Sequence, residues 1–336
     1  MVQHVFPKTR KLETDWLIPY DYPAMIDLHT HSSASDGSLG PGTLIEEAVK
    51  RKISSLALTD HDTITGLPEA EKAALERGIH FIPGVEFEII WKQEKRAVPE
   101  TPEIKDLSRR KKTSVLNAPA GEFHLLGLGI RQPSPGLKEA IEDMTRRRQG
   151  RNLEIVEKMN QAGIDVSYDE IKALAYSNAE EADRASIGRP HFADYLVKKK
   201  IVRNRDQAFM RFLGKGKPFY APKVGLEFEQ AVKLIKESGG IAILAHPMSL
   251  YTAWGRLPAL IKNLKERGLD GLEAWHPATK VSSCKRLEEL GKKLDLYITA
   301  GSDFHGAVRP DRKLGITAGG KKIDESYLEA IPGLLC

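Results

Sequence analysis

The sequence predicts an α/β fold, a seven-stranded (β/α)7 barrel of the TIM-like kind that carries a helical insertion. Three observations support this fold class. Helical patterns separate most of the short apolar segments, which begin near residues 25, 53, 81, 122, 240, 270 and 296. A chain of 336 residues is long enough for one large barrel with an insertion. Each segment carries an ionisable residue within it or near its C-terminal end, where parallel barrels place their functional groups.

Charge and cysteine content narrow the function classes. Lys and Arg total 51 against 46 Asp and Glu, and the net charge of +5 suits a phosphate-bearing substrate without requiring duplex nucleic acid. Cys284 and Cys336 form no CxxC motif, so we expect a reducing, cytoplasmic setting. No apolar run approaches the roughly 20 residues that span a bilayer, and residues 1–20 lack the apolar core of a signal peptide. We therefore expect no membrane partner.

The first apolar segment ends in a histidine pair. In Met25-Ile26-Asp27-Leu28-His29-Thr30-His31, side chains alternate between the two faces of a strand, so His29 and His31 project from the same face. Asp36 follows in a turn rich in Ser and Gly, from which its carboxylate can fold back toward the strand end. These residues predict part of a metal site, and the alternative is a pair of structural histidines.

The second segment also ends in ionisable residues, within Thr59-Asp60-His61-Asp62. We choose His61 as a metal ligand, because it follows directly on an apolar strand and precedes a turn. Asp60 or Asp62 either supports a ligand or caps the helix that follows.

An acidic residue interrupts the third segment. Glu86 lies between apolar neighbours, and a buried carboxylate is costly unless it is paired or binds a metal. Its two oxygens can each bind one ion, so Glu86 is a candidate bridging ligand, and Glu88 is an alternative. In the fourth segment, His124 lies among apolar residues and is either a core histidine or a ligand.

Two stretches interrupt the α/β alternation. Residues 91–120 contain the basic run 109–112, which is either a solvated excursion or an electrostatic lip for a polyanionic substrate. Residues 133–222 have helical patterning instead of strands. The predicted division is therefore a barrel, 1–132 and 223–336, with a helical substrate cap, 133–222.

Within the helical stretch, Gly188-Arg189-Pro190-His191 predicts the start of a helix, since Pro favours the first turn. Arg189 and His191 either reach a substrate phosphate from this position or form a buried capping pair.

The last three segments add further candidates: His246 ends one, His276 follows the next, and Asp303 and His305 end the last. Crossover helices make the strands parallel, so their C-terminal ends meet at one face. Such helices are expected over residues 43–52, 65–78, 228–238 and 257–267. Seven of the ten histidines lie on the strands or at their ends, which predicts one metal centre: His29, His31, His61, His124, His246, His276 and His305.

The motifs Asp-Leu-His-Thr-His-Ser, Thr-Asp-His-Asp, Gly-Val-Glu, Ala-His-Pro and Gly-Ser-Asp-Phe-His occur in this order along the chain. Together they resemble the polymerase and histidinol phosphatase (PHP) superfamily of metal-dependent phosphoesterases, over nearly the whole chain. The resemblance implies a distorted seven-stranded barrel of the PHP type. The stretch with Gly-Arg-Pro-His-Phe is similar to the branch that removes the 3′-phosphate of nucleoside 3′,5′-bisphosphates and in some members trims short RNA from its 5′ end.

The resemblance also implies two or three divalent ions, Mn, Fe or Zn, at the barrel mouth. It implies that the first ion is held by His29, His31, Glu86 and Asp303. The second would be held by Glu86, His124 and His246, and the third by Asp36, His61 and His305. The expected nucleophile is a metal-bound hydroxide, because clustered dications acidify water and neutralise phosphoryl oxygens.

The candidate catalytic residues are Asp36, His191 and His276, of which the two histidines are the candidate general acids. The same two histidines and Arg189 are the candidates for binding the substrate. A guanidinium binds phosphate in bidentate fashion, so we assign Arg189 to the second phosphate.

We therefore predict hydrolysis of a phosphomonoester, the 3′-phosphate of nucleoside 3′,5′-bisphosphates. Alternatives within the same class are an exonuclease on short 5′-phosphorylated RNA or DNA and a histidinol-phosphatase-like enzyme. From another class, the alternative is a non-catalytic barrel that binds metal or nucleotide, and the intact set of candidate ligands speaks against it. The expected partner is a small phosphorylated molecule or short RNA, and no protein partner is implied.

Overall fold

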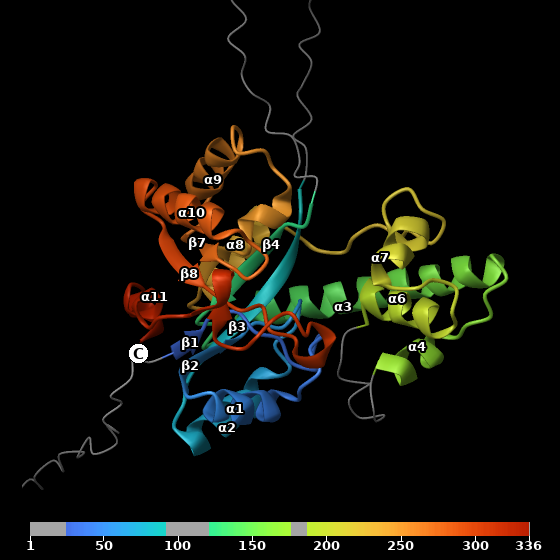
Figure 1. Ribbon diagram of the computed structural model, residues 1–336, viewed down its shortest axis with the longest axis horizontal. Coiled ribbons are helices and arrows are strands. Elements are labelled where there is room, and N and C mark those ends of the chain that lie inside the picture. The colour runs from blue at the N-terminus through green and yellow to red at the C-terminus, as the bar shows by residue number, and fades with distance from the viewer. Residues whose placement is uncertain (1–24, 92–120, 176–186, 336) are drawn as a thin grey trace, which may run out of the picture.

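The computed structural model describes residues 25–91, 121–175 and 187–335 (Figure 1). Its main sheet contains β1 (Met25–Asp27), β2 (Ile53–Leu58), β3 (His80–Ile90), β4 (His124–Leu128), β6 (Ile241–Leu244), β7 (Gly271–Trp275) and β8 (Tyr297–Ala300). These strands are neighbours in that order, and β5 (Leu226–Glu227) pairs with β3. All seven strand segments predicted from the sequence are confirmed. The basic run 109–112, residues 1–20 and Cys336 lie outside the described residues.

One predicted strand direction is wrong. β4 runs antiparallel to both of its neighbours, β3 and β6, so the sheet is mixed and does not follow a strict (β/α)7 order. Because β4 is reversed, its first residue, His124, pairs with Glu88 near the C-terminal end of β3. The reversal therefore brings the beginning of β4 to the edge where the parallel strands end.

The sheet curls so that its two outer strands approach each other beyond their C-terminal ends. The His31 amide donates to the Phe304 carbonyl at 2.9 Å, and the Asp303 amide donates to the His29 carbonyl at 2.9 Å. A bridge between Thr30 and Phe304 lies between these two bonds. The segments after β1 and β8 are thus held together by backbone hydrogen bonds, which fixes the positions of His29, His31 and Asp303.

Helices cover the outer face of the curled sheet (Figure 1). They are α1 (Pro41–Lys50), α2 (Leu67–Arg77), α8 (Phe228–Glu237), α9 (Leu257–Glu266), α10 (Val281–Lys293) and the short α11 (Ser326–Glu329). The helices expected over 43–52, 65–78, 228–238 and 257–267 are confirmed. In α1, Leu44, Ile45 and Ala48 are fully buried and join one apolar cluster with Leu56 and Leu58 of β2.

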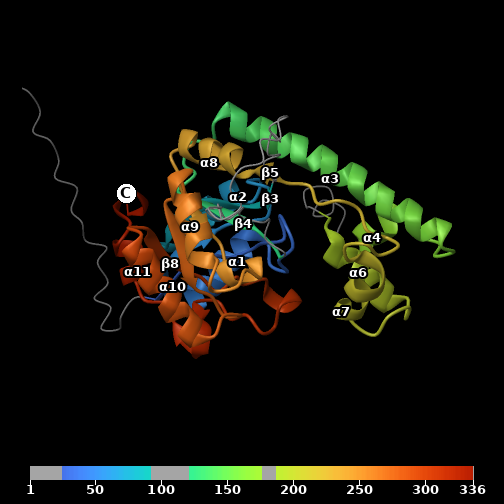
Figure 2. The same cartoon turned by 90° about the horizontal axis from the view of Figure 1, so that it is seen from above.

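A second group of helices lies beside the sheet. It contains α3 (Pro135–Gln161), α4 (Tyr168–Ala175), α6 (Arg189–Lys198), α7 (Arg205–Ala208) and a π-helical turn, η2 (Phe209–Leu213). Ser134 caps α3 by accepting a hydrogen bond from the Leu137 amide. The long α3 runs from beside α8 to α4 and α6 (Figure 2). None of the helices in the described ranges has an apolar stretch long enough to cross a membrane.

The two halves of α3 pack into different cores. Leu137 and Met144 join the apolar core of the sheet, whereas Ile155 and Met159 join a separate cluster with Phe192 and other side chains of the helical group. The division of the chain into 1–132 with 223–336 and 133–222 stays a prediction.

Candidate metal centre

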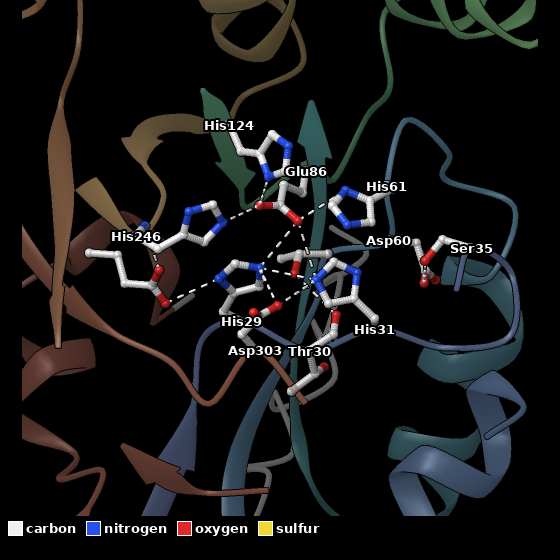
Figure 3. A network of polar contacts seen from close by, with 12 residues as sticks. His29, Thr30, His31, Ser35, Asp60, His61, Glu86, His124, His246 and Asp303 are labelled. Atoms are coloured by element: carbon white, nitrogen blue, oxygen red, sulfur yellow. Dashed lines mark hydrogen bonds and ion pairs between the residues drawn. The ribbon is translucent and has the colours of Figure 1, made fainter. Parts of the chain in front are cut away.

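The ends of the strands bring all nine predicted metal ligands together. Figure 3 shows seven of them: His29, His31, His61, Glu86, His124, His246 and Asp303. Nitrogen and oxygen atoms within 4.8 Å of one another form four groups. The groups are His31, Asp36, His61 and His305; His29, His31 and Asp303; His29, Glu86 and His246; and His61, Glu86 and His124. Two of these residues, His246 and Asp303, adopt positive φ angles of 27° and 51°. Strained backbone of this kind persists where surrounding structure enforces it, and it is concentrated at functional sites.

Glu86 lies at the centre of these groups and is fully buried. Its Oε1 atom lies 2.9 Å from His246 Nε2 and 3.0 Å from His124 Nδ1. Its Oε2 atom lies 3.1 to 3.3 Å from nitrogens of His29, His31 and His61. Burial alone would raise the pKa of Glu86. The surrounding imidazoles, with the largest effects from His61 and His29, instead hold this pKa well below its usual range. Each carboxylate oxygen therefore faces its own set of imidazoles, the arrangement a bridging ligand needs.

The distance between two histidines fits a shared ion. His29 Nε2 and His31 Nε2 are 3.0 Å apart, and Asp303 Oδ1 lies 3.5 and 3.3 Å from them. Two imidazole nitrogens bound to one ion at about 2.1 Å, with an angle of about 90–110° between them, lie about 3.0–3.4 Å apart. Among the described residues, the buried atoms His31 Nδ1 and Glu86 Oε2 have no hydrogen-bond partner. Buried polar atoms rarely remain unpartnered, so this donor set fits divalent ions.

Glu273 supports this centre from behind and was not among the predicted site residues. Its Oε1 accepts a hydrogen bond from His29 Nδ1 at 3.1 Å, and its Oε2 accepts one from the His246 amide at 2.8 Å. The proton of His29 is therefore on Nδ1, which leaves Nε2 free to bind an ion. The sequence held a signal, because Glu273 lies between apolar neighbours in its strand, as Glu86 does.

His246 and His305 are oriented by similar bonds. Ser249 Oγ donates its proton to the Glu122 carbonyl at 3.0 Å, so it accepts from His246 Nδ1 at 2.7 Å. His305 Nδ1 donates to the Asp303 carbonyl at 2.8 Å. In both rings Nδ1 donates to an oxygen, so Nε2 is the atom that would bind an ion, and it faces a carboxylate of the centre, Glu86 or Asp36.

Asp36 folds back to the strand end as expected. Its Oδ1 atom lies 3.2 Å from His305 Nε2, and its Oδ2 atom lies 3.9 Å from His61 Nε2. Burial alone would raise the pKa of Asp36, but His305 and His61 hold this pKa well below its usual range. Asp60 orders this turn by accepting hydrogen bonds from the Ser32 amide at 2.7 Å and from Ser35 Oγ at 2.6 Å.

Two open alternatives for acidic residues are resolved by these contacts. The α2 N-cap is Gly66, without a side-chain cap, so neither Asp60 nor Asp62 caps that helix. Asp62 forms an ion pair with Arg148 of α3. Glu88 contacts His124 Nε2 at 3.3 Å and Lys223 Nζ at 2.7 Å, so it supports a candidate ligand from outside the four groups.

His276 lies behind the centre. It is buried, its Nε2 atom is 3.2 Å from Asp303 Oδ2, and Arg312 Nη1 lies 2.8 Å from the same nitrogen. It is not among the described residues that line the cavity over the centre. This position favours a role in orienting Asp303 over contact with a substrate.

A cavity of ≈ 330 Å³ opens over the candidate ligands, between the strand ends and the helical group. One wall is formed by Asp36, His61, Glu86, His124, His246, Asp303 and His305. The helical group contributes four arginines and a histidine to the lining, and these residues form the basic wall of the cavity: Arg148, Arg151, Arg189, Arg205 and His191. The cavity therefore combines a candidate metal centre with a basic wall.

Of the four arginines of the basic wall, Arg148 and Arg205 are paired with carboxylates of the described residues, whereas Arg151 and Arg189 are not. Arg148 pairs with Asp62, and Arg205 forms a bidentate pair with Asp194 at 2.5 Å. No carboxylate of the described residues pairs with Arg151 or Arg189, and the buried Nε atom of Arg151 has no hydrogen-bond partner there. Burial, together with the charges of Arg148 and Arg189, lowers the pKa of Arg151 to about 10. Guanidinium groups without acidic partners are suited to binding an anion such as a phosphate.

His191 also lines the cavity and has a defined proton position. Its Nδ1 atom accepts a hydrogen bond from the Gly188 amide at 3.0 Å, so the proton of the neutral ring is on Nε2. Burial lowers its pKa, while Asp36 raises it. The predicted pair Arg189 and His191 thus begins α6 with both side chains at the cavity.

Comparisons with known proteins agree with this arrangement. The family model described as the PHP domain matches residues 27–198. A 5′-3′ exoribonuclease of Haemophilus influenzae is 35% identical over 279 residues, covering 83% of this chain and 89% of that protein. A 3′,5′-nucleoside bisphosphate phosphatase of Chromobacterium violaceum is 31% identical over 294 residues, covering 88% of this chain and 92% of that protein.

A solved structure has the same fold over most of its length. It is an amidohydrolase from Chromobacterium violaceum with bound sulfate and no metal. It superposes with a TM-score of 0.73 at 29% sequence identity and covers 92% of this chain and 97% of its own.

Proposed function

This chain belongs to the PHP-domain family of metal-dependent phosphoesterases, and on that premise we propose that it removes the 3′-phosphate of nucleoside 3′,5′-bisphosphates. One observation carries the proposal: a single cavity joins the candidate metal centre to Arg151 and Arg189, which have no acidic partner among the described residues. A bisphosphate places one phosphate at each. The bisphosphate phosphatase among the relatives supports the same substrate.

The candidate ligands divide into three sets. We assign His29, His31, Glu86 and Asp303 to one ion, Glu86, His124 and His246 to a second, and Asp36, His61 and His305 to a third. When bound, such ions neutralise phosphoryl oxygens and lower the pKa of a coordinated water. The mixture of imidazole and carboxylate groups suits Mn, Fe or Zn.

The chain's own residues bind the second phosphate. Arg151 and Arg189 present planar guanidinium groups, which match phosphate oxygens in bidentate fashion. Because Arg151 is largely buried beside two other arginines, a dianion at this point relieves the repulsion among them. This contact holds the substrate at a fixed distance from the metal centre, which is how binding orients a scissile bond.

His191 is the better placed of the two candidate general acids. When the bond from phosphorus to the 3′-oxygen breaks, that oxygen takes up a proton. His191 lines the cavity with Nε2 as its proton-bearing atom, whereas His276 lies behind Asp303. The ring acts as an acid in its doubly protonated form, in which Nδ1 also carries a proton and the hydrogen bond from the Gly188 amide is given up. A phosphate dianion near His191 raises its pKa and so offsets the loss of that bond.

A second candidate activity is the removal of nucleotides from the 5′ end of short RNA. The Haemophilus influenzae exoribonuclease favours it, because that relative is 35% identical over most of the chain. The same basic wall would then hold the 5′-phosphate of an oligonucleotide.

The test is phosphate release from adenosine 3′,5′-bisphosphate with and without added Mn, beside simple monophosphates and a short 5′-phosphorylated RNA. We expect Mn-dependent release of the 3′-phosphate, lost in His29→Ala and Asp303→Ala. Turnover confined to simple monoesters would refute the nucleotide assignment. Mn binding without turnover would favour a non-catalytic barrel.

A further inference from the structure

The described residues that line the cavity include one side chain of Phe, Tyr or Trp, namely Phe209. The rest of this lining consists largely of charged groups and histidines. Phe209 is half-buried, so part of its ring is open to the cavity. An aromatic face in an otherwise charged pocket has few uses except to contact a flat apolar group of the ligand.

The π-helical turn η2 accounts for the position of this ring. Ala208, the residue before η2, and Leu213, the last residue of η2, are five residues apart and both are fully buried, which is π-helical rather than α-helical spacing. Phe212, in the same turn, stacks on Phe219 at 5.1 Å between ring centroids and does not line the cavity. Both phenylalanines pack against the apolar cluster of the helical group, and Phe209 differs from Phe212 in that it also lines the cavity.

Phe209 is also next to the proposed phosphate site. The guanidinium carbon of Arg189 lies 5.9 Å from the centre of the Phe209 ring. A ligand whose phosphate binds Arg189 therefore has the face of Phe209 within reach of its neighbouring groups. In a nucleotide, those groups are the sugar and the base.

We propose that Phe209 is the platform on which the nucleobase of the substrate stacks. The proposal rests on the proposed function and adds to it the element that recognises the base. Every base has an aromatic face, so stacking on Phe209 accepts purines and pyrimidines alike and selects nucleotides over sugar phosphates without a base. Arg189, between ring and phosphate, joins the two parts of the recognition surface.

The experiment compares two substrates that differ only in the base: 2′-deoxyadenosine 3′,5′-bisphosphate and its abasic analogue, 1,2-dideoxyribose 3,5-bisphosphate. For the unaltered protein with Mn, we expect kcat/KM to be about ten-fold higher with the base, within the range that base–aromatic stacking supplies. Phe209→Leu should lower kcat/KM about ten-fold for the nucleotide and leave the abasic substrate unchanged. Phe209→Trp should retain the preference.

Phe212→Leu is the matched control, because it makes the same change one turn away, outside the cavity lining. It should leave the ratio between the two substrates unchanged. An equal loss on both substrates in Phe209→Leu, or no loss on the nucleotide, would overturn the platform. Failure of the unaltered protein to hydrolyse either substrate would instead refute the proposed function, and the platform with it.

Discussion

Glu273 holds two candidate metal ligands at once: His29 through a 3.1 Å bond to its ring, and His246 through a 2.8 Å bond to its backbone amide. One buried carboxylate outside the ligand set thus fixes the tautomer of the first imidazole and the position of the second. Burial alone would raise the pKa of Glu273, but the contact with His29 lowers it. The Glu273 carboxylate therefore remains charged beside His29 Nδ1.

Glu273→Gln should therefore weaken Mn binding by about 10–100-fold, because outer partners of metal-ligating histidines usually contribute that much. Titration calorimetry with Mn on the metal-stripped protein measures the change. Glu289→Gln, an exposed carboxylate on α10, is the control and should bind Mn as the unaltered protein does. Unchanged Mn affinity in Glu273→Gln would show that Glu273 does not support the ligands.

Removing an arginine of the basic wall should weaken the binding of substrates with two phosphates and leave the binding of simple monophosphates nearly unchanged. We expect Arg189→Ala and Arg151→Ala each to raise KM for adenosine 3′,5′-bisphosphate about ten-fold or more, with little change for a simple monophosphate, since a charge-assisted hydrogen bond contributes about 1.5–3 kcal/mol. Steady-state kinetics on both substrates measures this. Arg146→Ala, on the same helix as Arg151 but exposed and paired with Asp143, should change neither value. Equal effects on the two substrates would argue against a second phosphate site.

The two candidate general acids should differ in what their loss changes. His191→Ala should lower kcat about 10²–10⁴-fold and remove the fall in activity at high pH, because the acid form of the ring is the one that donates. His276→Ala should instead lower Mn affinity, because it contacts Asp303 and not the cavity. His80→Ala, at the first residue of β3, is the control. A His191→Ala enzyme with an unchanged pH profile would exclude His191 as the acid.

The stability of the metal-free protein and the extra stability gained from metal should depend on pH in opposite ways. Burial alone would lower the pKa of His31, but contacts with Asp303 and Glu86 raise this pKa to about 9 in the metal-free protein. A raised pKa in the folded state stabilises the protein fully below pH 6.5, the ordinary value, and this contribution is lost as pH rises through 9. Metal binding needs the neutral ring, so it strengthens over the same range.

We therefore expect the Tm of metal-stripped protein to fall between pH 6.5 and 9, while the increase in Tm caused by Mn grows. Thermal melts in matched buffers with and without Mn measure both trends. A Tm difference that does not change across this range would contradict the assignment of His31 as a buried ligand.

The candidate ligands could be predicted from the sequence because all but Asp36, which follows in a turn, lie within an apolar segment or at its end. His29 and His31 are two residues apart on a strand, and Glu86 is an acid among buried side chains, so local spacing already places them on one side. The structure then brings these positions within a few ångströms of one another.

Other features depend on tertiary structure. Apolar alternation has no direction, so the reversal of β4 could not be predicted from the pattern around His124. Arg151 follows three consecutive arginines on a helix, and which of them faces a cavity depends on how α3 packs. Glu273 could have been predicted by the reasoning applied to Glu86, because both interrupt a buried strand.

Identification of the product released from adenosine 3′,5′-bisphosphate tests the central claim most directly. Metal-stripped protein is titrated with Mn, and the nucleotide product and inorganic phosphate are measured together, with Asp303→Ala as the reference. The proposed function predicts adenosine 5′-monophosphate and phosphate in equal amounts, formed only with Mn and not by the variant. Adenosine 3′-monophosphate as the product, or phosphate release that persists without Mn, would contradict it.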